Sequence, residues 1–109
     1  MTISDILDCL TKEICTIYEK FIVKIVLYGS VARGTQSEES DIDVALFVSS
    51  SIPKEKHSEM TEKLVDLELI CGKILSVVQI DLNKYEEWKD ILPFYKNIKN
   101  EGVVLWAKS

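Results

Sequence analysis

Two polar signatures, each attached to an apolar run, constrain the fold of this chain more than any other feature. The run at 22–28 is apolar at nearly every position and ends in Gly29-Ser30. Ten residues further on, Asp41-Ile42-Asp43 opens a second apolar run that ends at position 48. A continuous β-branched run predicts a strand that is covered on both faces. The stretch therefore predicts a strand, a glycine turn, one or two helical turns at 31–34, a polar loop and a second strand.

The two aspartates of the second signature lie two positions apart on a predicted strand. Because side chains alternate along a strand, Asp41 and Asp43 should leave the same face, which they share with Ala45 and Phe47. Two like charges at this spacing cannot both stay ionised in a half-buried site unless a cation lies between them. Mg²⁺ prefers oxygen ligands and is usually held by one or two carboxylates together with substrate phosphates. Asp41 and Asp43 are therefore predicted to hold Mg²⁺.

The glycine turn supplies the groups that a phosphate needs. Gly29 permits a tight turn and a close approach of phosphate to the backbone, and Ser30 adds a hydroxyl donor. The first amides of the following segment are free to point at an anion. Arg33 either clamps a phosphate with its planar guanidinium group or pairs with an acidic neighbour such as Glu38 or Glu39. Turn and acid pair together predict in-line attack on phosphorus in a metal-bound nucleotide.

This pattern resembles the signature of a known family. Gly29-Ser30, Ala32-Arg33-Gly34, Ser40 and Asp41-Ile42-Asp43 stand in the order found in the minimal nucleotidyltransferases, the smallest members of the polymerase-beta-like nucleotidyltransferase superfamily. The likeness is dense over 28–48 and looser beyond. It implies a Mg²⁺-dependent transfer of a nucleoside monophosphate, AMP from ATP, to a hydroxyl group. The resemblance also implies the acceptor, a helical HEPN-domain partner for which this chain is the antitoxin of a toxin-antitoxin pair.

The same resemblance raises the question of a third carboxylate. Family members that transfer nucleotides generally carry one more acid on the third core strand, where it completes the metal site. In one register of this chain, Asp81 is that acid. In the other register the matching position holds Ser76 and the third acid is absent, so that activity would be slow or would need a partner's carboxylate. Strand parity separates the two, because Ser76 shares a face with Val78 and Ile80 whereas Asp81 lies on the opposite face.

Two other functions remain open at this point. The first is a non-catalytic module of the same fold that neutralises a partner protein by binding it, since fold does not prove activity. The second is transfer to a small molecule such as an aminoglycoside, which would need an acceptor pocket built by a homodimer.

Composition limits the partners and the location. The net charge is -5 and no basic cluster is present, which argues against long nucleic acid as a partner. No apolar run approaches the roughly 20 residues of a membrane helix, and the N-terminus mixes charge through its apolar positions, unlike a signal peptide. Three cysteines, an odd number without metal-binding spacing, indicate reduced thiols. We therefore expect a cytoplasmic protein without membrane contact.

At 109 residues the chain is expected to form one domain, 1–109, of the nucleotidyltransferase fold. The fold class expected is α/β (α+β), with a small mixed sheet flanked by helices. The other predicted elements are a helix at 3–21 with a capping box at Thr2 and Asp5, a helix from Pro53 to Gly72, a strand at 74–80, helices at 85–92 and 94–99, and a strand or packed tail at 103–106.

Overall fold

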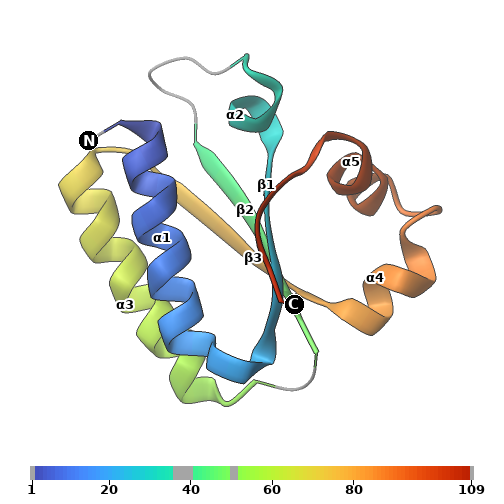
Figure 1. Ribbon diagram of the computed structural model, residues 1–109, viewed down its shortest axis with the longest axis horizontal. Coiled ribbons are helices and arrows are strands. Elements are labelled where there is room, and N and C mark those ends of the chain that lie inside the picture. Colours follow the sequence, from blue (N-terminus) through green and yellow to red (C-terminus); the bar gives the residue numbers. More distant parts are fainter. Residues whose placement is uncertain (1, 36–40, 50–51, 109) are drawn as a thin grey trace.

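Four strands form one mixed sheet in the order β3-β2-β1-β4 in the computed structural model, which describes residues 2–35, 41–49 and 52–108 (Figure 1). Strand β1 (Ile22–Tyr28) lies inside the sheet and is antiparallel to both β2 (Ile42–Val48) and β4 (Val103–Ala107). Strand β3 (Leu75–Asp81) runs parallel to β2. The prediction of a small mixed sheet flanked by helices is therefore confirmed.

One face of the sheet is covered by the two long helices, α1 (Ile3–Tyr18) and α3 (Lys54–Cys71) (Figure 1). Helix α1 begins at the predicted capping box, in which the Thr2 hydroxyl accepts from the Asp5 amide at 3.1 Å and the Asp5 carboxylate accepts from the Thr2 amide. Their apolar stripes and alternate residues of β1 and β2 form the larger of two cores. Its buried members are Ile6, Leu10, Ile14, Ile17, Tyr18, Ile22, Ile25, Leu27, Ile42, Val44, Leu46, Val48, Met60, Leu67 and Leu75.

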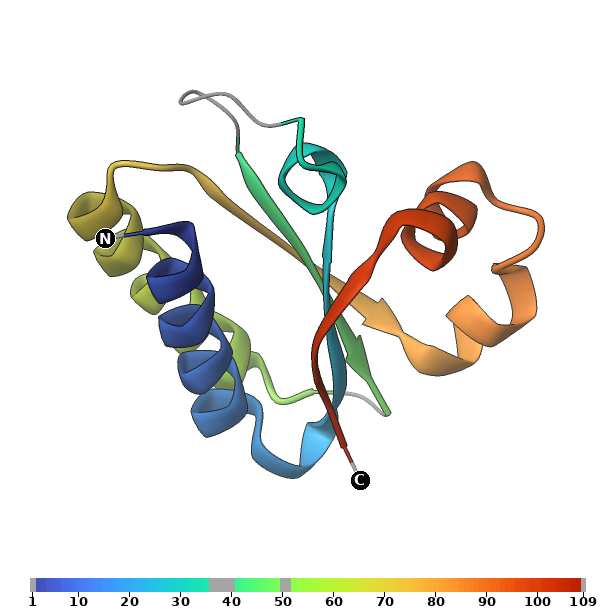
Figure 2. The same cartoon turned by 45° about the horizontal axis from the view of Figure 1, so that its top comes forward.

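The other face is covered by two short helices, α4 (Leu82–Trp88) and α5 (Pro93–Glu101), as Figure 2 shows. The core beneath them is smaller. Its centre is an edge-to-face contact of Phe47 with Tyr85, whose ring centroids lie 4.7 Å apart. The buried members of this core are Val26, Ala45, Phe47, Ile80, Tyr85 and Ile98.

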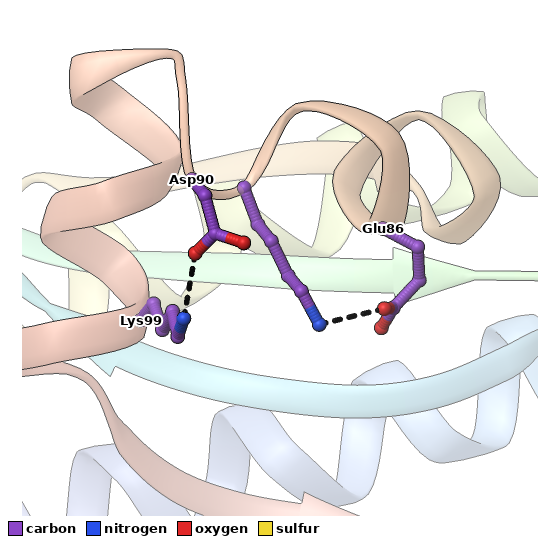
Figure 3. A network of polar contacts seen from close by, with 4 residues as sticks. Glu86, Asp90 and Lys99 are labelled. Carbon is purple, nitrogen blue, oxygen red and sulfur yellow. Dashed lines mark hydrogen bonds and ion pairs between the residues drawn. The ribbon is translucent and has the colours of Figure 1, made fainter.

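Ion pairs on the surface join the segments around α4 and α5. Lys99 on α5 pairs with Asp90 in the connection between the two helices at 2.7 Å, and Lys89 pairs with Glu86 on α4 at 2.8 Å (Figure 3). These side chains are largely exposed. Exposed ion pairs contribute little to stability, so the packing of Phe47 against Tyr85, and not the ion pairs, holds this layer on the sheet.

Several predicted boundaries were wrong, among them those of the first helix and of the two short helices, which span Leu82–Trp88 and Pro93–Glu101 instead of 85–92 and 94–99. The first helix ends at Tyr18, because Glu19 adopts a positive φ of 51° and a 3-10 turn, η1 (Glu19–Phe21), carries the chain into β1. Helix α4 begins at Leu82, since the Asp81 side chain caps it. Helix α5 begins at Pro93, where the missing proline amide costs no helical hydrogen bond.

Cys9, Cys15 and Cys71 are free thiols packed at the edge of the larger core. Burial raises the pKa of the Cys15 thiol, which keeps it protonated at neutral pH. None of the described helices combines the length and the apolar character that a bilayer crossing requires.

Candidate active site

The glycine turn lies directly against the second strand. Helix α2 (Gly29–Arg33) follows β1 without a connecting loop, and Gly29 has a φ of 78°, in the left-handed region that favours glycine. A Cβ atom built on Gly29 would lie 3.2 Å from Cγ of Asp43 and would overlap its Oδ2. The backbone of the turn and one carboxylate of the acid pair are therefore in contact, as a shared phosphate-metal site requires.

Strand β2 aims Asp43 at this turn. Asp43 is the Cα partner of Tyr28, the last residue of β1. Ala45 and Phe47 belong to the smaller core, whereas Ile42, Val44, Leu46 and Val48 belong to the larger one. This alternation places Asp43 on the face covered by α4 and α5. The predicted parity of β2 is confirmed from Ile42 to Val48, whereas Asp41, predicted to open the strand, lies exposed immediately before it.

The electrostatics of Asp43 reveal an excess of negative charge. Burial raises the pKa of the Asp43 carboxyl above its usual range, and the charge of Asp41 raises it further, while the Arg33 guanidinium opposes both. The effect extends to Tyr28, whose phenol pKa is raised by burial and by the Asp43 charge. A cation between the two carboxylates would relieve this repulsion. Their hard oxygen donors suit a divalent ion such as Mg²⁺, so the residues present fit the predicted metal.

Arg33 is engaged by an acidic partner from the other end of the chain. Its Nη1 donates to Oε2 of Glu101, at the end of α5, over 3.0 Å, and both side chains are more than a third exposed. Of the two alternatives from the sequence, the ion pair with an acidic neighbour is the one observed. Glu38, Glu39 and Ser40 lie outside the described residues.

Ser30 lies in the first turn of α2, where helical amides have no acceptor within the helix. Its carbonyl accepts from the Thr35 amide at 3.0 Å and, with Val31, closes the C-terminal end of this short helix at Gly34. The turn thus stands at the end of β1, where Gly29 touches Asp43. The turn predicted to grip phosphates is present beside the acid pair.

Asp81 does not join the acid pair, and its predicted role as third metal ligand is corrected here. In the β2-β3 register Asp43 faces Ser76, and Asp81 faces Val48 at the opposite end of the strands. Five residues of strand separate positions 76 and 81, about 16 Å. Asp81 caps α4 instead, since its Oδ1 accepts from the amides of Asn83 and Lys84 at 2.8 and 3.3 Å. Of the two registers, the structure adopts the one that places a serine beside Asp43.

No cluster of three or more His, Cys, Asp or Glu side chains suited to a metal occurs within residues 2–35, 41–49 and 52–108. Within the described part of the chain, the acid pair is accompanied by the Arg33 guanidinium and by the neutral groups of the glycine turn. A pocket of about 220 Å³ lies elsewhere, between α3 and β3, and includes Leu46 and Val77 of the larger core in its lining. Its lining comes from the face of the sheet opposite Asp43, so it is separate from the acid pair.

Two residues of this region carried no predicted role. Glu101 holds Arg33 from 68 positions away, and no local pattern in the sequence could have indicated that pair. Tyr28 ends β1 opposite Asp43, and its ring meets Phe94 edge to face with 5.6 Å between centroids. The position of Tyr28 one residue before the glycine turn was the available signal.

A glycine-serine turn against an acid pair, on a small mixed sheet between helices, defines a nucleotidyltransferase. The sequence model described as "Polymerase beta, Nucleotidyltransferase" matches residues 11–109. The chain belongs to this family. The predicted resemblance is thus confirmed.

Relatives and solved structures agree with this assignment. Two proteins of Methanocaldococcus jannaschii, both provisionally named protein adenylyltransferases, are similar. One is 42% identical over 65% of this chain and 71% of its own length, and the other is 30% identical over 82% and 83%. The fold is shared with an MNT antitoxin complex of Shewanella oneidensis, described as containing a tri-AMPylated HEPN toxin. There the TM-score is 0.59 at 16% identity, over 96% of this chain and 72% of the other. A toxin-antitoxin structure with AMP-PNP gives 0.61 at 18% identity, over 94% and 74%.

Proposed function

We propose that this chain transfers AMP from ATP to a hydroxyl group of a HEPN-type partner protein, as the antitoxin of a toxin-antitoxin pair. The observation that carries the proposal is the contact of the Gly29 turn with the Asp43 carboxylate. The names of the relatives and the AMPylated toxin of the structural neighbour support the nucleotide and the acceptor class. The three free thiols are compatible with work in the cytoplasm.

Each residue of the site has a part in the proposed reaction. Asp41 and Asp43 would hold Mg²⁺, and the turn at Gly29 and Ser30 would bind the outer phosphates of ATP. When bound, the cation would neutralise phosphate charge and stabilise the leaving oxygen. Arg33, on the same short helix, would exchange Glu101 for a phosphate oxygen. The protein contributes position and charge, which dominate phosphoryl-transfer catalysis.

The proposed reaction is a single displacement. The acceptor oxygen forms a bond to the α-phosphorus, and the bond from that phosphorus to its bridging oxygen breaks. Pyrophosphate leaves, and the acceptor proton passes to solvent. Because the acceptor proton passes to solvent, the reaction as written needs no basic side chain at a fixed position.

The test is incubation with Mg²⁺ and ATP labelled at the α-phosphate, with and without a HEPN-domain protein. We expect label on the HEPN protein with the natural chain and none with Asp43→Asn, the matched control that keeps the shape of the side chain. Label in neither reaction, with no complex formed, would overturn the proposal.

The second candidate, a non-catalytic module that neutralises its partner by contact, is favoured by one observation. Ser76 stands where a third carboxylate would complete the site. A tight complex with the HEPN protein that carries no label, and that forms equally well with Asp43→Asn, would select this function. Transfer to a small molecule such as an aminoglycoside by a homodimer is the remaining alternative, and label on the aminoglycoside in the same assay would identify it.

A further inference from the structure

Position 76 is the nearest neighbour of Asp43 on the third strand. Ser76 and Asp43 are Cα partners in the parallel β2-β3 ladder, and paired residues of adjacent strands point to the same face. Val78 and Ile80 confirm the parity, because they pack with the smaller core on the Asp43 side. The half-buried Ser76 side chain thus leaves the sheet beside the Asp43 carboxylate.

Ser76 brings no charge to this position. The described part of the chain offers no third carboxylate in its place, since Asp81 is used by α4 at the far end of β3. Among the described residues, the negative charges of the site are therefore those of Asp41 and Asp43.

Two carboxylates suit one divalent cation better than two. Paired catalytic ions lie about 3.5 to 4 Å apart, so their mutual repulsion must be offset by shared anionic ligands. An ion on the triphosphate draws phosphate oxygens from the nucleotide and needs one or two carboxylates. An ion on the acceptor side meets only one phosphate group, so it depends on protein carboxylates that the first ion already uses.

We infer that this site binds one divalent cation per nucleotide, and that the serine at position 76 is what withholds a second. The inference rests on the proposed nucleotide site and specifies its metal content. It also gives position 76 a defined effect, because an aspartate there would add the missing charge next to Asp43.

The experiment is equilibrium dialysis of the full chain with Mn²⁺ and α,β-methylene-ATP, a nucleotide that cannot be transferred. The measured quantity is the ratio of Mn²⁺ to nucleotide retained by the protein. We expect a ratio of one for the natural chain, two for Ser76→Asp, and one for Ser76→Asn, which has the shape of aspartate without its charge. Electron paramagnetic resonance should show coupled Mn²⁺ pairs in Ser76→Asp alone.

A ratio of two in the natural chain, or a ratio of one in a folded Ser76→Asp, would overturn the inference. The first result is measured on the natural chain, so the inference can be overturned even if Ser76→Asp does not fold. Retention of no nucleotide by any form would instead overturn the proposed function together with this inference.

Discussion

Gly29 and Asp43 touch across the first two strands of the sheet, with no room between them for a side chain. A Gly29→Ala substitution adds a Cβ at a φ of 78° and forces the Asp43 carboxylate to move. We expect a loss of stability of about 2 kcal/mol or more and a loss of nucleotide binding. Chemical denaturation and nucleotide titration measure the two effects.

Gly34→Ala is the matched control for that substitution. Gly34 has a similar φ of 74°, but a Cβ there would meet no atom within 4 Å. It should cost about 1 kcal/mol, from the backbone conformation alone, and leave nucleotide affinity unchanged. Equal effects of the two substitutions would show that contact with Asp43 is unimportant.

Asp43→Asn should leave the metal-free protein as stable as before or slightly more stable at neutral pH. Because the folded-state pKa of Asp43 is raised above the ordinary 3.8, the native state binds this proton more tightly than the unfolded chain. Stability therefore falls as pH rises through the window from about the ordinary value to the raised one. The gain should stay below about 1 kcal/mol, since the group is only partly buried.

Thermal melts of both forms without metal, at acidic and at neutral pH, check this prediction. The two curves should converge in acid, where Asp43 is protonated in both folded and unfolded chains. Marked destabilisation of Asp43→Asn at neutral pH would mean that the carboxylate has a structural partner.

The Arg33–Glu101 ion pair predicts opposite effects of two substitutions on nucleotide affinity. Glu101→Gln releases Arg33, so the affinity for ATP should rise a few-fold, whereas Arg33→Ala should lower it about tenfold. Stability should change by less than about 1 kcal/mol in both, because the pair is exposed. Isothermal titration at low and high salt measures the affinities. If neither substitution alters the affinity for ATP, Arg33 forms a surface ion pair and does not bind the nucleotide.

Asp81→Ala tests the corrected role of that residue. Loss of its two hydrogen bonds to the first turn of α4 should cost about 1 kcal/mol of stability. Asp81→Asn should cost much less, because asparagine caps helices equally well. Both should transfer AMP at the natural rate. A loss of Mn²⁺ binding in Asp81→Ala would restore it as a metal ligand.

The site was predictable wherever a local sequence pattern fixed which face of an element a side chain lies on. Asp41 and Asp43 lie at the start of β2, whose two faces are fixed by cores on both sides, and glycine is the only residue type that fits at position 29 against Asp43. The register of β3 was not predictable, because both faces of this strand carry apolar residues, and such a strand can slide without exposing them. The choice between Ser76 and Asp81 follows from the pairing with β2, which is a tertiary property.

The helical boundaries failed for a related reason. Nothing in the sequence marks Glu19 as a residue with positive φ, and the turn there is imposed by the path from α1 into β1. The partnership of Arg33 with Glu101 likewise depends on how α5 returns across the sheet. Both features are set by packing between elements and not by local propensity.

The unequal size of the two cores has a consequence for motion. Among the described residues, the core that α1 and α3 form with the sheet contains fifteen buried side chains. The core that α4 and α5 form with the sheet contains six. Opening of a segment costs free energy in proportion to the apolar contacts it gives up. Amide protons of 82–101 should thus exchange with solvent sooner than those of α1. A large acceptor could reach Asp43 when α4 and α5 move away from the sheet, while α1 and α3 stay packed on the other face.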